Sequence, residues 1–178
     1  MGLRKASAYS RQRVRPYTRK SSNAKKAYVK AVPPNKIVKF HMGNQQDYNQ
    51  GKHKFIVRFL STEKAQVRDN ALESVRMWLN KILDEKVPGE YYLVVKTYPH
   101  HILRENKTAS GAGADRLSSG MSHSFGSVEG RAAIVLAGKE IFFVACETEQ
   151  GARIAREALT AIKAKMPCRS RIFTEKIQ

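Results

Sequence analysis

Apolar and polar side chains follow two different periods along the chain. Alternating apolar residues, or runs rich in β-branched and aromatic residues, are typical of strands. They predict strands over 36–41, 53–60, 91–98, 100–104, 131–137, 140–147 and 171–173. Gly138-Lys139 separates two of these runs, 131–137 and 140–147, and predicts a hairpin between them.

Two longer segments carry apolar residues at the i, i+3, i+4 spacing of an amphipathic helix. They predict helices over 62–86, before Pro88, and over 149–165, before Pro167. Trp78 lies on the apolar stripe of the first helix, where core packing is its expected role. Strands connected by hairpins, interrupted by two helices, predict an α+β fold with a mainly antiparallel sheet and two packed helices.

The composition adds that the partner is a polyanion. The 178 residues hold 33 Lys and Arg against 15 Asp and Glu, a formal net charge of +18, and 42% are hydrophobic, enough for one packed core. No apolar run approaches the roughly 20 residues of a membrane span, and no secretory signal is visible. Two cysteines, Cys146 and Cys168, fit a reducing compartment. The sequence therefore predicts a soluble, cytoplasmic protein with no membrane partner.

Most of the net charge lies in the first quarter of the chain. Residues 1–46 contain twelve basic residues and no acid. We expect residues 1–34 to form an extended arm on a single domain over 35–178, with cations on nucleic-acid phosphates and tyrosines stacking on bases. A solvated or targeting tail is the alternative. The candidate binding residues of this arm are Arg4, Lys5, Arg11, Arg13, Arg15, Tyr17, Arg19, Lys20, Lys25 and Lys26.

Packing does not explain the long segment over 105–130. Its 26 residues include five glycines and six serines, and its net charge is −1. Insertions of this length inside a compact domain are usually functional or disordered. Glycines let the backbone approach another molecule closely, so we predict a functional loop, with a surface insertion of no function as the alternative.

No catalytic or cofactor site emerges from the motifs. Gly111-Ala-Gly113 begins like a dinucleotide fingerprint, but Arg116 stands where the third glycine belongs. The spacing of the histidines and acids around the loop matches no zinc pattern, which leaves a metal site disfavoured; these residues are His100, His101, Glu105, Asp115 and His123. The sequence predicts no enzyme, no metal and no cofactor.

Several segments resemble one ribosomal family. They are Arg15-Pro16-Tyr17-Thr18-Arg19, Phe40-His41-Met42-Gly43-Asn44, Leu103-Arg104-Glu105-Asn106, Ala112-Gly113-Ala114-Asp115-Arg116-Leu117, Gly120-Met121 and Met166-Pro167-Cys168. In this order they are similar to the archaeal and eukaryotic large-subunit protein L-ten-e, counterpart of the bacterial L-sixteen protein. Where the family commonly has basic residues after Gly120-Met121 and after Phe125-Gly126, this chain has Ser122 and Ser127.

The resemblance implies an α/β-hammerhead fold and a structural place in the large ribosomal subunit. It implies large-subunit rRNA, nearby A-site tRNA, neighbouring ribosomal proteins and assembly factors as partners. The loop near the tRNA and peptidyl-transferase region would correspond to Arg104, Lys107, Gly111, Gly113, Asp115, Arg116, Gly120 and Met121. A non-ribosomal RNA-binding regulator or chaperone is the alternative.

Overall fold

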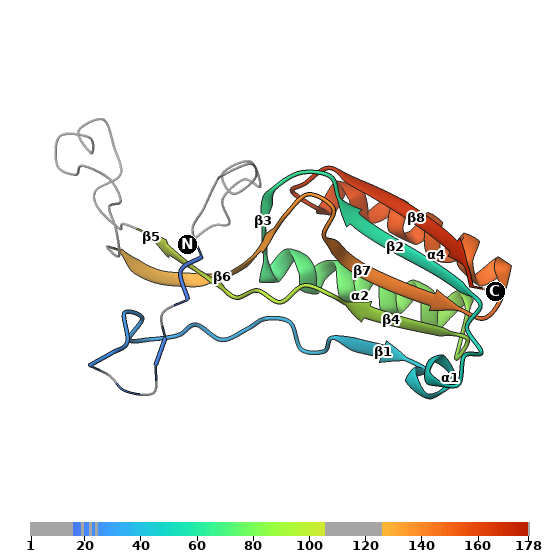
Figure 1. The fold of residues 1–178 in the computed structure, drawn as a ribbon, viewed down its shortest axis with the longest axis horizontal. Helices are drawn as coiled ribbons and strands as arrows, with labels where there is room; N and C mark the ends of the chain where they lie inside the picture. Colours follow the sequence, from blue (N-terminus) through green and yellow to red (C-terminus); the bar gives the residue numbers. More distant parts are fainter. Residues whose placement is uncertain (1–15, 19, 22, 24, 106–125, 178) are drawn as a thin grey trace.

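The computed structural model describes residues 16–18, 20, 21, 23, 25–105 and 126–177 (Figure 1). The elements follow one another as strands, helices and strands, as the hydrophobic pattern predicts. In chain order they are β1 (His41–Gly43), α1 (Gln45–Asn49), β2 (Phe55–Ser61), β3 (Ala65–Arg68), α2 (Asp69–Lys86), β4 (Tyr91–Val95), β5 (His101–Glu105), β6 (Ser127–Val135), β7 (Glu140–Cys146), α4 (Glu149–Ala161), the 3-10 turn η2 (Ile162–Lys165) and β8 (Ser170–Lys176).

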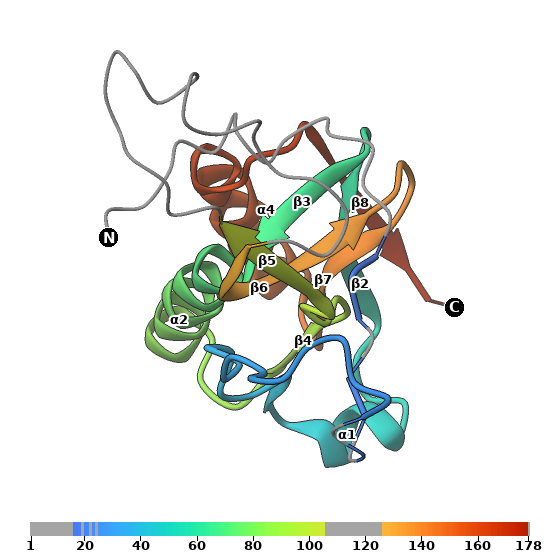
Figure 2. The ribbon, with the colours of Figure 1, turned by 90° about the vertical axis from the view of Figure 1, so that its left-hand side faces the viewer.

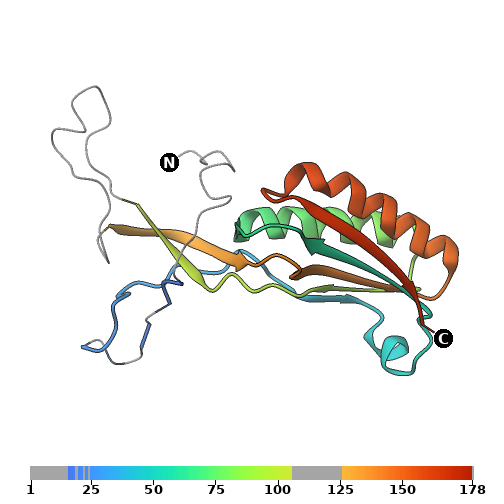
Figure 3. The same cartoon turned by 45° about the horizontal axis from the view of Figure 1, so that its top comes forward.

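The strands form two antiparallel sheets. The larger sheet has the order β1-β4-β7-β2-β8, and the smaller one has the order β3-β6-β5. The chain passes from one sheet to the other between β2 and β3, through α2 between β3 and β4, between β4 and β5, and between β6 and β7. The smaller sheet therefore extends away from the larger one, and β5 and β6 lie at one end of an elongated molecule (Figures 1 and 3).

Helices α2 and α4 cover one face of the larger sheet (Figure 3), and viewed from the β5 end they lie together beside it (Figure 2). The alternation along β7 explains this arrangement, because Phe142 and Val144 join the core beneath the helices. Phe143 and Ala145 point to the other face, where Tyr48 of α1 packs against their cluster. The predicted α+β class with two packed helices is confirmed, and α1 is an additional short helix. Trp78 is half-buried against the core beneath the helices.

The predicted hairpin is wrong. Gly138 makes the expected turn, with φ +80° and a 3.1 Å hydrogen bond from the Lys139 amide to the Leu136 carbonyl. The two strands then separate, since β6 pairs with β3 and β5 while β7 pairs with β2 and β4. Strand β7 is buried from Ile141 to Cys146, and this separation lets it pair with an apolar strand on each side. Val144, for example, lies opposite Val57 of β2 and Leu93 of β4.

Several predicted boundaries also differ from the structure. The helix predicted from residue 62 begins at Asp69, because Ala65 and Val67 pair as strand β3 with Val135 and Ala133. The predicted loop over 105–130 is shorter at its end, since β6 begins at Ser127. The other shifts are small: the last strand covers 170–176, and the second helix turns into η2 at residue 162.

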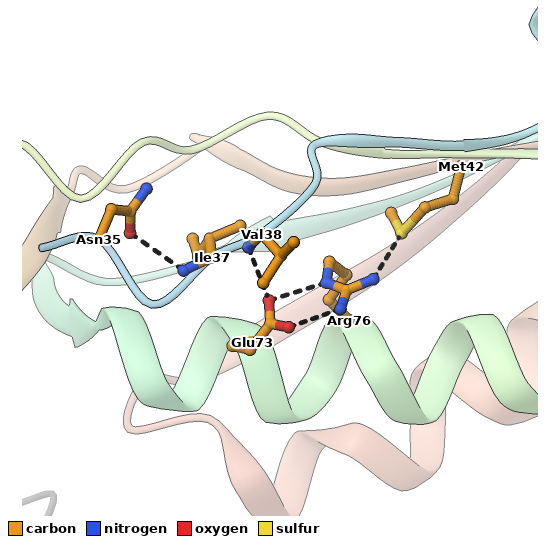
Figure 4. A network of polar contacts seen from close by, with 6 residues as sticks. All are labelled: Asn35, Ile37, Val38, Met42, Glu73 and Arg76. Carbon is orange, nitrogen blue, oxygen red and sulfur yellow. Dashed lines mark hydrogen bonds and ion pairs between the residues drawn. The ribbon is translucent and has the colours of Figure 1, made fainter.

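The strand predicted over 36–41 is confined to 41–43. The chain before it binds the carboxylates of α2 instead of a neighbouring strand. The Lys36 amide donates to Asp69 at 3.3 Å, and the Val38 amide donates to Glu73 at 3.4 Å. Arg76 completes the network: its guanidinium forms an ion pair with Glu73 at 2.5 Å and donates a hydrogen bond to the Met42 sulfur at 3.3 Å (Figure 4).

Candidate nucleic-acid interface

The structure describes only part of the predicted interface. Of the arm residues it describes Tyr17, Lys20, Lys25 and Lys26, and of the loop residues it describes Arg104. The others lie outside the described residues and stay predictions: Arg4, Lys5, Arg11, Arg13, Arg15, Arg19, Lys107, Gly111, Gly113, Asp115, Arg116, Gly120 and Met121.

Tyr17 lies against β5, the strand that leads into the predicted loop. The Ile102 amide donates to the Tyr17 carbonyl at 3.0 Å, and the Tyr17 amide donates to His101 Nδ1 at 2.9 Å. The Arg104 guanidinium carbon lies 3.8 Å from the centre of the Tyr17 ring, a cation–π contact. The structure thus brings together two residues that the sequence assigned to separate parts, the arm and the base of the loop.

His101 accepts the Tyr17 amide of the arm with a neutral imidazole ring. Its side chain is buried, and burial, with help from His100 and Arg104, lowers the pKa of His101 from 6.5 to about 4. Nδ1 must be unprotonated to accept the Tyr17 amide, so near neutral pH the ring proton belongs on Nε2. Sequence reasoning treated His101 only as a disfavoured metal ligand and missed this role. Within the described residues, no group of three or more His, Cys, Asp or Glu side chains could hold a metal ion.

Asn23 organises the next part of the arm. Its side-chain oxygen accepts the Lys25 amide at 3.0 Å, and its carbonyl accepts the Lys26 and Ala27 amides, each at 3.1 Å. An Asn side chain that binds the backbone two residues on is a turn-forming contact. The turn places Lys25 and Lys26 beside Tyr28 around a hollow of about 450 Å³. Two cations and an aromatic ring beside a hollow suit phosphates and an unstacked base.

Burial alternates along the segment after this turn. Ala27 and Val29 are buried, while Tyr28 between them is 55% exposed. The two small apolar side chains are therefore covered, and the aromatic side chain lies largely at the surface. The described part of the arm is irregular here, and the predicted division at residue 34 stays a prediction.

Arg131 is a second residue that sequence reasoning missed. From β6 its Nε donates to the Pro33 carbonyl at 2.7 Å, and a terminal nitrogen donates to the Tyr98 hydroxyl at 2.9 Å. It therefore ties the end of the arm to the smaller sheet. The only signal in the sequence is an arginine that opens an otherwise apolar run, which does not name its partners.

Lysines of this part of the arm face solvent. Lys20, Lys25 and Lys26 precede Asp47, the first acid of the chain, and all three are exposed. Exposed cations attract polyanions because they neutralise phosphates. No helix in the described part of the chain is long and apolar enough to cross a bilayer.

A basic surface of this kind suits a ribosomal protein as well as a non-ribosomal RNA-binding regulator or chaperone, and comparison with known proteins decides between them. The family described as ribosomal protein L16p/L10e matches residues 13–173. The chain belongs to this family. The large ribosomal subunit protein uL16 of Hyperthermus butylicus is 42% identical over 158 residues, covering 88% of this chain and 82% of that protein. The uL16 proteins of Thermofilum pendens and Methanococcus maripaludis are 40% and 41% identical over 179 residues, and cover 100% of this chain.

Membership in the L16p/L10e family identifies a ribosomal protein, a structural component and not an enzyme. The match spans the arm from residue 13, the predicted loop and the described fold as far as residue 173, within β8. The resemblance to the archaeal and eukaryotic L-ten-e type is confirmed by the archaeal relatives. The hammerhead assignment and the roles of single residues stay predictions.

Proposed function

We propose that this protein is a structural component of the large ribosomal subunit that binds large-subunit rRNA through its arm and loop. The family match and the names of the relatives support the assembly, and the acid-free basic arm supports RNA as the direct partner. Neighbouring ribosomal proteins and assembly factors are further partners in this proposal.

The contact of Tyr17 with β5 is the observation that carries the proposal. It holds the arm beside Arg104, at the base of the predicted loop, with hydrogen bonds of 2.9 and 3.0 Å. Cations of the arm and amides of the loop would then approach RNA from the same end of the molecule. Arg104 on the Tyr17 ring limits the freedom of both groups before RNA arrives, which lowers the entropy that binding costs.

The finer part of the proposal places the loop near A-site tRNA and the peptidyl-transferase region. Its support is the resemblance of Ala112-Gly113-Ala114-Asp115-Arg116-Leu117 to the family's central loop. Arg116 would anchor the loop on phosphate, and Asp115 would order the loop's own amides. The protein would support tRNA positioning by ordering RNA, and the chemistry of peptide transfer would belong to the RNA.

Sedimentation tests the ribosomal role. The tagged full chain, expressed in a related host, is followed through density gradients before and after a high-salt wash. We expect it to comigrate with large subunits at near one copy each and to survive the wash. Release by salt, or migration in light fractions with free RNA, would favour the non-ribosomal regulator or chaperone instead.

A further inference from the structure

The positive charge of the folded part is concentrated at its C-terminal end. Residues 149–178 hold seven basic and three acidic residues, a net charge of +4, whereas residues 47–148 hold fourteen and twelve, a net charge of +2. The first of these segments forms α4, η2 and β8. Three of its bases, Arg153, Arg156 and Lys176, lie around Phe55 at the start of β2, and the other four lie in η2 and around the start of β8, towards the end of β2. In Figure 1 the C-terminus and the start of α4 lie at the opposite end of the molecule from β5.

A groove of about 310 Å³ opens between α4 and β8. Arg153 and Arg156 line it from the helix, Thr174 and Lys176 line it from the edge strand, and Phe55 lines it from β2. Glu149 and Glu175 also contribute to its lining. Because β8 is the edge strand of the larger sheet, this side of the groove is open along the strand.

Both acids of the groove already have cationic partners. Glu149 pairs with Arg153 at 3.1 Å, one helical turn away, and Glu175 pairs with Arg58 of β2 at 3.1 Å. Their charges are therefore largely neutralised within the protein. What the groove offers to a ligand is decided by its remaining cations.

Arg156 and Lys176 are those cations. Neither has a carboxylate partner among the described residues, and both are exposed. The Lys176 ammonium lies 5.8 Å from the centre of the Phe55 ring, so the aromatic ring holds it at the groove without neutralising it. A guanidinium fork and an ammonium facing one hollow form a pair of donors suited to phosphate oxygens.

We propose that the α4–β8 groove binds the phosphate backbone of an RNA segment distinct from the one at the arm and loop. The inference rests on the proposed rRNA-binding function and adds a second contact at the far end of the molecule. An acidic peptide fits less well, because Phe55 is the only large apolar side chain of the lining and Lys176 already covers it. The protein would thereby connect two RNA segments.

Stoichiometry of RNA binding tests the second contact. The full chain is titrated with a short fluorescent RNA duplex at physiological salt and followed by sedimentation velocity. The variant R156Q/K176Q removes the two available cations. K64Q/K139Q removes the same charge from exposed lysines beyond the opposite end of β2, and serves as the matched control. Thermal unfolding of each variant verifies the fold.

We expect the parent and the control to bind two duplexes. We expect R156Q/K176Q to bind the second duplex at least about tenfold more weakly, since two charge-assisted contacts are lost. Equal affinity of both double variants for the second duplex would overturn the inference. A second pair of results would also overturn it: the parent binds one duplex, and it binds a polyglutamate peptide that R156Q/K176Q no longer binds. These results would assign the groove to an acidic protein. A parent that binds one duplex leaves the proposed function standing, whereas a parent that binds none contradicts both.

Discussion

At the scale of single residues, the arm depends on contacts with residues far away in the sequence. Tyr17 and His101 are 84 positions apart, yet the backbone of one donates to the ring of the other. The arrangement needs a neutral imidazole, which burial provides by disfavouring the charged form. Because the cation on the Tyr17 ring comes from Arg104, a single side chain joins the arm to the base of the loop.

This contact predicts a pH dependence with a defined sign. The pKa of His101 is about 4 in the folded protein and 6.5 in an unfolded chain, so between these values the unfolded chain binds the extra proton. The stability from His101 is complete above pH 6.5 and is lost as the pH falls toward 4. We expect the free energy of unfolding, measured in urea, to decrease over this window.

The variant His101→Gln isolates this effect from the carboxylates that titrate nearby. Glutamine does not titrate, so its stability should change less between pH 6.5 and 4 than that of the parent. His100→Gln is the control: it removes the smaller contribution of His100 to the His101 pKa and keeps the burial that dominates it, and the His100 nitrogen contacts the Tyr98 carbonyl rather than the arm. Identical pH profiles for the parent and His101→Gln would contradict the assignment.

At the scale of elements, α2 does more than cover the sheet. Its first turns carry Asp69 and Glu73, which accept amides of the chain before β1. The Arg76 guanidinium bonded to Glu73 holds the pKa of that carboxyl below its usual value of 4.5. In the irregular segment between arm and β1, the Lys36 and Val38 amides are therefore satisfied by a helix, and the Ile37 amide by Asn35 of the same segment (Figure 4).

Removing Glu73 should destabilise the fold. In Glu73→Ala the Arg76 guanidinium and the Val38 amide both lose an acceptor. Because the side chains of Glu73 and Arg76 are mostly covered, we expect a loss of about 1–2 kcal/mol in unfolding free energy. Glu85→Ala on the same helix removes an exposed pair with Lys81 and should cost less than about 0.5 kcal/mol. Urea denaturation of both variants compares them, and equal costs would show that the network adds nothing.

At the scale of the whole molecule, two ends carry different contacts. Tyr17 of the arm contacts β5 at one end, while the groove with Arg156 and Lys176 lies at the other. Among the described residues, the main core cluster contains none from the arm. We therefore expect RNA binding and folding to depend on different parts of the chain and to be separable by deletion.

Deleting residues 107–121 should leave a folded protein. Strand β5 ends at Glu105 and β6 begins at Ser127, so both paired strands remain, joined by a shorter connection. We expect one cooperative thermal transition, retained association with large subunits and impaired tRNA accommodation in a translation assay. Loss of the cooperative transition would show that the segment stabilises the fold, contrary to the proposal.

The hydrophobic pattern was sufficient for features that depend on near neighbours. Leu72, Val75, Leu79 and Leu83 are fully buried on α2 as their spacing predicts, and the sequence alone determined the acid-free basic arm. Periodicity reports which side of an element is buried, because it reflects the geometry of one segment. The motifs of the loop and arm likewise indicate the family without the fold, because they are local strings of residues.

Only the tertiary structure decided which segments meet. Nothing in the Gly138-Lys139 turn says that β6 and β7 separate into two sheets, and nothing in His101 or Arg131 names Tyr17 or Pro33 as a partner. Such choices are made among distant strands and backbone donors, where burial and pairing of the whole chain compete. The sequence by itself determined the class of residues that we expect to bind RNA, and the fold decided which distant residues contact Tyr17 and Pro33.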